Sequence, residues 1–133
     1  MTNIFPSDIF YTQFSHLYSE YAFDKKLYIS AVNNFIKNET PKVETMIDIG
    51  AGDGKRGKYI AELLKIKSLT LLDNSNGMIA LSKNIPNIKF EKLDISNSDF
   101  SLDKKYDVAI CLWNVLGHIS YGKMGVALKN IAS

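Results

Sequence analysis

Acidic residues and glycines lie close together where a short apolar run ends. Residues 43–49 are mostly apolar, Asp48 lies inside this run, and glycines follow at positions 50, 52 and 54. The run predicts a buried strand, and the alternating glycines predict a loop whose bare backbone a ligand can approach closely. A helix that begins at Lys55 would direct its N-terminal amides at such a ligand. The pattern therefore predicts a nucleotide-binding loop, with Asp48, Gly50, Ala51, Gly52 and Gly54 as candidate binding residues.

Three further polar residues each follow directly after an apolar run. They are Asp73, Asp94 and Asn114. In an open parallel sheet the ligand lies outside the carboxyl ends of the strands, because these ends meet at one edge. We therefore expect the three side chains to converge with the glycine loop on one crevice.

The spacing of apolar residues predicts alternating strands and helices after residue 41. Strands are predicted over 43–49, 68–72, 88–93 and 108–113, and helices over 55–65, 75–84 and 121–133. The last strand is apolar throughout, which is typical of a strand buried on both faces. Alternation at these intervals favours right-handed crossovers and a parallel sheet.

Two helical patterns precede the first strand. The first has apolar residues at helical spacing, namely Phe10, Phe14, Leu17 and Tyr21. The second covers residues 25–37, and its predicted inward face consists of Tyr28, Ala31, Val32, Phe35 and Ile36. We therefore expect residues 1–40 to form a helical cap, from which Tyr11 and Tyr18 are candidates to line the ligand site.

The bulk composition fits one compact domain over residues 1–133, with the cap at 1–40 and a core at 41–133. The chain has 133 residues, of which 46% are hydrophobic. Its 16 basic and 14 acidic residues are mixed along the chain, which offers no electrostatic footprint for nucleic acid. We see no secretory signal and no apolar stretch near the ~20 residues of a membrane span, so we expect a cytoplasmic protein. We expect no metal site.

The glycines also match a dinucleotide-binding pattern. Gly52, Gly54 and Gly57 have the spacing of G-x-G-x-x-G, and Asp73 lies at a suitable distance for a ribose-binding acid. This interpretation does not explain Asp48, whose charge inside the strand would repel a pyrophosphate. A cationic or zwitterionic ligand would suit that acid better.

Residues 48–54, with the sequence DIGAGDG, resemble the acid-x-Gly-x-Gly-x-Gly signature of class I S-adenosylmethionine-dependent methyltransferases. The resemblance implies that Asp73 binds the ribose hydroxyls and that Asp94, with the neighbouring backbone at Ile95, binds the adenine amino group. Residues 106–118 resemble the fourth-strand motif, which runs beside the methionine part of the cofactor. The remaining residues that we assign to the cofactor site are Asn74, Met78, Leu112, Trp113 and Asn114.

The resemblance implies a Rossmann-like open parallel sheet in the order 3-2-1-4 with flanking helices. We expect strands 5 to 7 of the family to be missing from this chain, which ends at Ser133. The fourth strand would then lie at an exposed edge, which proteins usually cover. We expect either a truncated form of a longer enzyme or a second subunit over this edge, as in a homodimer.

The fourth-strand motif favours a small-molecule acceptor. Methyltransferases that act on exocyclic amino groups of DNA bases typically carry two prolines after the Asn or Asp here, whereas Val115 and Leu116 follow Asn114 in this chain. The sequence of residues 111–118 is more similar to that of small-molecule methyltransferases, including the glycine and sarcosine N-methyltransferase type. A base is required only where the acceptor must lose a proton, and His118 is the candidate. The alternatives are a non-catalytic module that binds the cofactor or its demethylated product, and an NAD(P)-binding domain.

Overall fold

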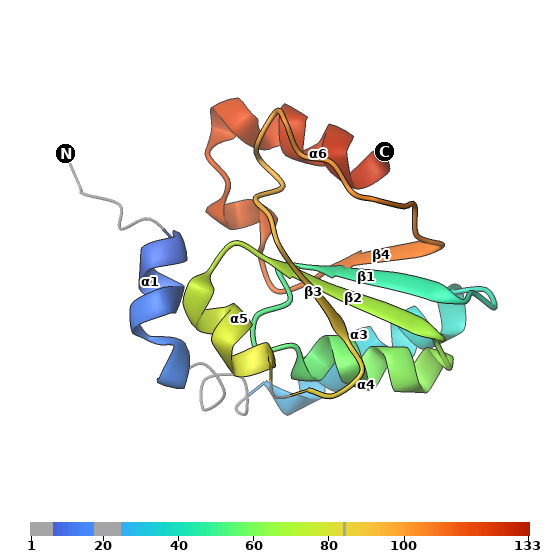
Figure 1. Ribbon diagram of the computed structural model, residues 1–133. Helices are drawn as coiled ribbons and strands as arrows, with labels where there is room; N and C mark the ends of the chain where they lie inside the picture. The colour runs from blue at the N-terminus through green and yellow to red at the C-terminus, as the bar shows by residue number, and fades with distance from the viewer. Residues whose placement is uncertain (1–6, 18–24, 84) are drawn as a thin grey trace.

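A four-stranded parallel sheet forms the centre of the structure, a computed structural model that describes residues 7–17, 25–83 and 85–133 (Figure 1). Its strands are β1 (Thr45–Ile49), β2 (Ser68–Asp73), β3 (Lys89–Lys92) and β4 (Val108–Cys111). They lie in the order β3-β2-β1-β4, and every neighbouring pair is parallel. The predicted fold class and strand order are therefore confirmed.

Helices cover both faces of the sheet. α3 (Lys26–Glu39) and α4 (Lys55–Leu64) lie on one face, and α6 (Met124–Ala132) lies on the other (Figure 1). α1 (Ser7–Gln13) and α5 (Asn76–Ser82) lie side by side near the carboxyl ends of the strands. Two 3-10 turns, η1 (Leu116–His118) and η2 (Tyr121–Lys123), connect β4 to α6. None of the described helices is long and apolar enough to cross a membrane.

The core divides into two clusters because neighbouring strand residues point to opposite faces. Met46, Leu71 and Ile110 pack with α4, whereas Ile47 and Leu72 pack with α6. The fourth strand is less buried than predicted. Only Ile110 of its four residues is buried, and Ala109 is exposed, since β4 lies at the edge of the sheet and pairs with β1 alone in the part of the chain that the structure describes.

The cap differs from the prediction in two ways. A bend at Phe14 interrupts the predicted helix, so α1 ends at Gln13 and a short helical stretch follows at 15–17. Tyr21, the last residue of the predicted stripe, lies outside the described residues. The predicted inward face of α3 is wrong at Tyr28, Ala31 and Phe35, which are exposed. The inward side carries the buried Asn33, whose Oδ1 accepts a hydrogen bond from Arg56 Nη2 at 3.2 Å. This polar contact with α4 fixes a rotation of α3 that apolar spacing does not reveal.

α1 is seated on α5 by a close backbone contact. A Cβ atom at Gly77 would lie 2.8 Å from Thr12 Cα and 3.0 Å from Tyr11 O, so only glycine permits this approach. Thr12 Oγ1 also lies 3.2 Å from Ser75 Oγ, within hydrogen-bond distance. The contact holds Tyr11 over the carboxyl end of the sheet.

Asp48 is a buried acid in the central strand. Its side chain lies on the α4 face, and a Cβ atom at Gly57 would overlap Asp48 Oδ2, so glycine is required where the helix crosses the acid. Burial raises the pKa of Asp48 to about 7. The positive charge of Arg56 lowers this pKa and the negative charge of Asp73 raises it, but burial dominates.

The raised pKa of Asp48 predicts that stability falls as the pH rises. Between about pH 4 and pH 7 the unfolded chain has already lost this proton and the folded chain still holds it. The free energy of unfolding should therefore decrease with pH by up to about 1.4 kcal/mol per pH unit from this group. Urea denaturation of the wild type and Asp48→Asn at pH 5 and pH 7 measures it. We expect the wild type to lose more stability than Asp48→Asn over this interval, and equal losses would contradict the assignment.

Candidate functional site

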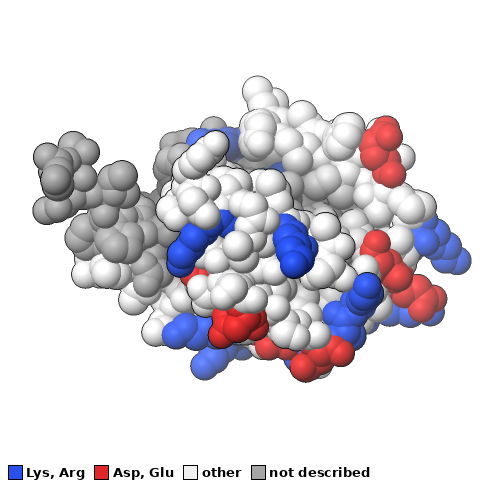
Figure 2. All heavy atoms as spheres, turned by 90° about the horizontal axis from the view of Figure 1, so that it is seen from above, with Lys and Arg blue, Asp and Glu red and all other residues white. Residues whose placement is uncertain are grey.

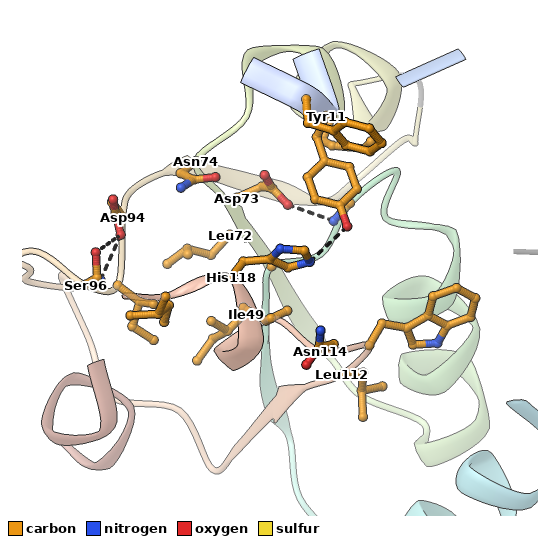
Figure 3. Close-up of a pocket in the computed structure, with 18 of the residues that line it drawn as sticks. Tyr11, Ile49, Leu72, Asp73, Asn74, Asp94, Ser96, Leu112, Asn114 and His118 are labelled. Atoms are coloured by element: carbon orange, nitrogen blue, oxygen red, sulfur yellow. Dashed lines mark hydrogen bonds between the residues drawn. The ribbon is translucent and has the colours of Figure 1, made fainter. Parts of the chain in front are cut away.

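A pocket opens at the carboxyl ends of the strands, between the sheet edge, α1, α5 and the turns after β4 (Figure 3). It is where the sequence predicts the ligand site. Most of the residues predicted for the site line this pocket, namely Tyr11, Gly50, Gly52, Asp73, Asn74, Met78, Asp94, Ile95, Leu112, Trp113, Asn114 and His118.

The other predicted residues lie elsewhere. Among the described residues, Asp48, Ala51 and Gly54 do not line the pocket. The side chain of Asp48 lies on the α4 face of the sheet, against Gly57. Ala51 belongs to the core cluster on the same face. Tyr18 lies outside the described residues.

The glycine loop presents bare backbone to the pocket. Gly50 and Gly52 have φ angles of 69° and 58°, in the left-handed region that favours glycine. A Cβ atom at Gly50 would overlap the side chain of Val115, so glycine also allows the turn after β4 to approach the loop. The amides of Gly50 and Ala51 both donate to Leu72 O, at 2.8 and 3.0 Å, which fixes the loop to the end of β2.

Asp73 joins two segments at the end of β2. Its Oδ2 accepts a hydrogen bond from Gly52 N at 2.9 Å (Figure 3). Its Oδ1 accepts one from Ser75 N at 2.8 Å. Burial raises the pKa of Asp73, and the backbone hydrogen bonds from Ser75, Gly52 and Asn74 oppose the shift. The carboxylate therefore holds the glycine loop beside the start of α5.

Asp94 makes a similar turn after β3. Its Oδ1 accepts hydrogen bonds from Ser96 N at 2.8 Å and from Ser96 Oγ at 2.7 Å. Ser96 lines the pocket and is nine-tenths buried, although its sequence position alone gave no reason to select it. Each carboxylate oxygen can accept more than one hydrogen bond, so Asp73 and Asp94 can both accept from a ligand as well. This side of the pocket is suited to ligand hydroxyl and amino groups.

Met78 is among the residues that line the pocket. It is 1% exposed, and its backbone amide lies 3.4 Å from the capping Ser75 Oγ. The side chain is thus packed in the protein interior beside the pocket. Both interpretations of Met78, as core packing and as a ligand contact, are compatible with this position.

Tyr11 and His118 meet across the pocket. Tyr11 OH lies 3.1 Å from His118 Nε2, and the two rings are nearly perpendicular with centroids 5.5 Å apart (Figure 3). The residues are 107 positions apart in sequence, and α1 and η1 bring them together. His118 and the hydroxyl group of Tyr11 can therefore share a proton where the cap lines the pocket.

The chain after β4 turns in a strained conformation. Trp113 and Asn114 have φ angles of 62° and 61°, which is uncommon for residues other than glycine. Strain of this kind costs on the order of 1–3 kcal/mol per residue and clusters at functional sites. Because of this turn β4 ends at Cys111 instead of the predicted Trp113. Trp113 and Asn114 both line the pocket.

Cations surround the indole of Trp113. Lys25 Nζ and Arg56 Cζ each lie 5.7 Å from the centroid of the ring, within the range of a cation–π contact. Lys25 lines the pocket, and sequence reasoning missed it because it precedes the glycine loop by more than twenty residues with no recognisable spacing. Arg56 contacts the ring from the first turn of α4.

Comparison with known proteins gives a family match and similar structures. A family model described as a methyltransferase domain matches residues 46–133. A protein of Invertebrate iridescent virus 6, named "Putative methyltransferase 235L", is 34% identical over 108 residues, which are 77% of this chain and 40% of that protein. The chain thus spans less than half the length of this curated relative.

Two solved structures show the same fold at low sequence identity. CalS10 of Micromonospora echinaspora, described as an amino pentose methyltransferase with S-adenosylmethionine bound, has a TM-score of 0.70 and 19% identity over 86% of this chain and 50% of its own. DesVI of Streptomyces venezuelae has a TM-score of 0.71 and 18% identity over 88% of this chain and 50% of its own. Since the family model matches more than half of the chain, the chain belongs to the methyltransferase domain family, the class I S-adenosylmethionine-dependent methyltransferases.

Proposed function

We propose that the chain binds S-adenosylmethionine and takes part in transferring its methyl group to a small-molecule acceptor. The observation that supports this most is the convergence of bare glycine backbone, Asp73 and Asp94 in one pocket, with His118 also lining it. When bound, the cofactor supplies a methyl group that is attached to a sulfonium. Once the methyl group is transferred, the sulfur departs as a neutral thioether. The protein then has to bind the two reactants, align them and accept a proton where the acceptor releases one.

The residues present fit the cofactor. Asp73 can accept from the ribose hydroxyls, and Asp94 can accept from the adenine amino group, since neither carboxylate is saturated by its backbone partners. A dinucleotide fits less well. Two acids line the pocket and would repel a pyrophosphate. Gly57, the third glycine of the dinucleotide pattern, packs against Asp48 on the α4 face of the sheet and does not line the pocket.

The proposal of a small-molecule acceptor draws on charge and on the solved structures. Basic and acidic side chains are interspersed on the face shown in Figure 2, without a field of a single sign. Nucleic-acid interfaces are strongly basic, so this face gives no support to such a partner. CalS10 is described as an amino pentose methyltransferase and KedS8 as a sugar N-methyltransferase. We extend an amine acceptor from KedS8 to this chain as part of the proposal.

A non-catalytic binding module is the second candidate. The chain spans about half the length of the solved structures above, so groups that bind the acceptor can lie outside it. Calorimetric titration with S-adenosylhomocysteine, NAD and NADP tests the cofactor, and a panel of amines tests methyl transfer. Binding of NAD alone would overturn the cofactor assignment. Binding of S-adenosylhomocysteine without transfer to any amine would favour the module.

The exposed edge of the sheet supports a further part of the proposal. Among the described residues β4 has a strand partner on one side only, and such edges are usually covered. We propose that a second copy of the chain covers β4 in a homodimer. Light scattering coupled to size-exclusion chromatography should give twice the mass of 15.0 kDa. A monomer that persists at high concentration would exclude the dimer.

Replacing Asp73 should weaken cofactor binding. Asp73→Ala removes the proposed partner of the ribose hydroxyls, and leaving such groups unsatisfied costs about 1 to 3 kcal/mol, or about 5- to 150-fold in Kd. Titration with S-adenosylhomocysteine measures it. The matched control is Asp53→Ala, because Asp53 Oδ1 also accepts a backbone hydrogen bond in this loop, from Lys55 N at 3.2 Å, but does not line the pocket. An unchanged Kd for Asp73→Ala would count against the assignment.

Replacing His118 should slow methyl transfer and leave cofactor binding intact. A positioned base typically contributes 10²- to 10⁴-fold, so His118→Gln should lower kcat by about 100-fold or more on a protonated amine. His16→Gln is the control, because His16 is exposed and does not line the pocket. Equal rates for His118→Gln and the wild type, at saturating cofactor, would rule out His118 as the base.

A further inference from the structure

The loop after β3 lines the pocket, but the strand ladder ends before the loop begins. The last aligned pair of β2 and β3 joins Asp73 to Lys92, and among the described residues β3 pairs with β2 alone. Residues 93–97 nevertheless all line the pocket, with Asp94 among them. The sheet therefore fixes where this loop starts, and another element has to fix its course past the pocket.

Asn130 on α6 makes the contact that does this. Its Nδ2 donates to Ile95 O at 2.8 Å and to Asn97 O at 2.9 Å. The two carbonyl groups flank Ser96, so one side chain holds the loop on both sides of this residue. The segment between β3 and β4 accordingly runs close to α6 (Figure 1). No residue from Met124 to Ala132 lines the pocket, so α6 acts on it through the loop.

An asparagine is suited to this position by the chemistry of its two partners. Carbonyl oxygens only accept hydrogen bonds, and the amide nitrogen carries two hydrogens and no charge, one hydrogen for each carbonyl. Ile95 is 5% exposed, so leaving its carbonyl group without a partner would be costly. Asn97 O has a further donor in Phe100 N at 3.3 Å, but that contact lies within the loop. Asn130 thus ties the turn to another element by hydrogen bonds that the loop cannot supply itself.

The contact bears on Asp94 because the turn around Ser96 is closed on itself. Asp94 Oδ1 accepts hydrogen bonds from Ser96 N and from Ser96 Oγ (Figure 3). Asp94 O accepts one from Asn97 N at 3.1 Å. Ala127 of α6 packs in the same buried cluster as Ile95, so apolar packing and the amide of α6 hold the same loop. The direction of the Asp94 carboxylate therefore depends on α6.

We propose that Asn130 is a positioning residue that aims the Asp94 carboxylate and thereby makes the pocket discriminate between nucleobases. The proposal rests on the function proposed above, because it places the adenine amino group at Asp94. An amino group donates to a carboxylate, whereas a carbonyl group at the same position of the base would be repelled by it. Discrimination of this kind requires a carboxylate that stays within hydrogen-bond distance of the base, and a displaced loop would lose it.

Two nucleosides that differ at this position of the base test the proposal. S-adenosylhomocysteine carries the amino group, and S-inosylhomocysteine carries a carbonyl group instead. In the wild type the Kd of S-adenosylhomocysteine should be lower by about tenfold or more. Asn130→Asp places a carboxylate against two carbonyl groups, so the loop is released and this ratio of Kd values should fall by about fivefold or more. Calorimetric titration measures both Kd values.

Two controls separate positioning from a general loss of stability. Asn34→Asp makes the same chemical change at an exposed position of α3 that does not line the pocket, and it should keep the wild-type ratio. Ile131→Val weakens the packing of α6 beside Asn130 and keeps the amide. It should lower the midpoint of thermal unfolding and leave the ratio unchanged. If Asn130→Asp does not fold, Asn130→Ala removes the donor without adding charge and should lower the ratio in the same direction.

Hydrogen exchange reports on the loop in the absence of any ligand. The amide of Ser96 should exchange about tenfold faster in Asn130→Asp, because the turn opens once α6 no longer holds it. The amides of Gly52 and Ser75, which Asp73 holds, are the internal control and should keep their exchange rates. Unchanged exchange at Ser96 would show that the loop is held without Asn130 and would overturn the proposal.

The titrations can fail in two distinguishable ways. An unchanged ratio in the Asn130 variants, an equal loss of affinity for both nucleosides, or equal binding of both by the wild type would overturn Asn130 as a positioning residue for the base. In each of these cases binding of S-adenosylhomocysteine by the wild type still supports the proposed function. If the wild type binds neither nucleoside, the cofactor proposal fails and the role of Asn130 in base discrimination fails with it.

Discussion

The carboxylate of Asp73 is the contact on which the rest of the pocket depends. One oxygen holds the amide of Gly52 and the other holds that of Ser75, so a single side chain joins the glycine loop to the start of α5. Ser75 in turn lies within hydrogen-bond distance of Thr12, which continues the connection to α1. An acid is suited to this position because it can accept from two backbone amides and still accept from a ligand. The pocket is thereby held open between three segments that are distant in sequence.

The face of the sheet that α4 covers has a polar cluster that connects β1, α4 and α3. Asp48, on β1, acts electrostatically on Arg56 of α4, and Arg56 donates to Asn33 of α3 while it contacts Trp113. This cluster links the cap to the turn after β4. Burying polar groups is costly unless they are hydrogen-bonded, so the cluster specifies one orientation of α3 where apolar packing alone would allow several. Asp48, the acid before the first glycine, therefore does not line the pocket but supports it from the α4 face of the sheet.

The parallel sheet and most of the pocket could be predicted from the sequence because they depend on local patterns, whereas the strand order was implied by the family resemblance. Apolar runs specified the strands, and polar residues after them specified Asp73, Asp94 and Asn114 as pocket residues. The prediction was wrong for the inward face of α3 and the end of β4. Those features depend on contacts between distant residues, such as Asn33 with Arg56, and on the strained backbone at Trp113, which no periodicity encodes. Lys25 was missed for the same reason, since the fold alone brings it to Trp113.

The two ends of the pocket are built in different ways, and this bears on what each can recognise. The end proposed to bind the nucleoside is made by strand ends and by backbone groups that Asp73 and Asp94 hold in place, so its shape follows mainly from the sheet itself. The other end depends on the cap, through Tyr11 against His118 and Lys25 against Trp113. Methyl transfer from a sulfonium requires mainly alignment of the acceptor, so small changes in the cap can alter the acceptor without disturbing the donor site. Tyr11 and Lys25 are therefore the positions where substrate preference would diverge first between chains that share this sheet.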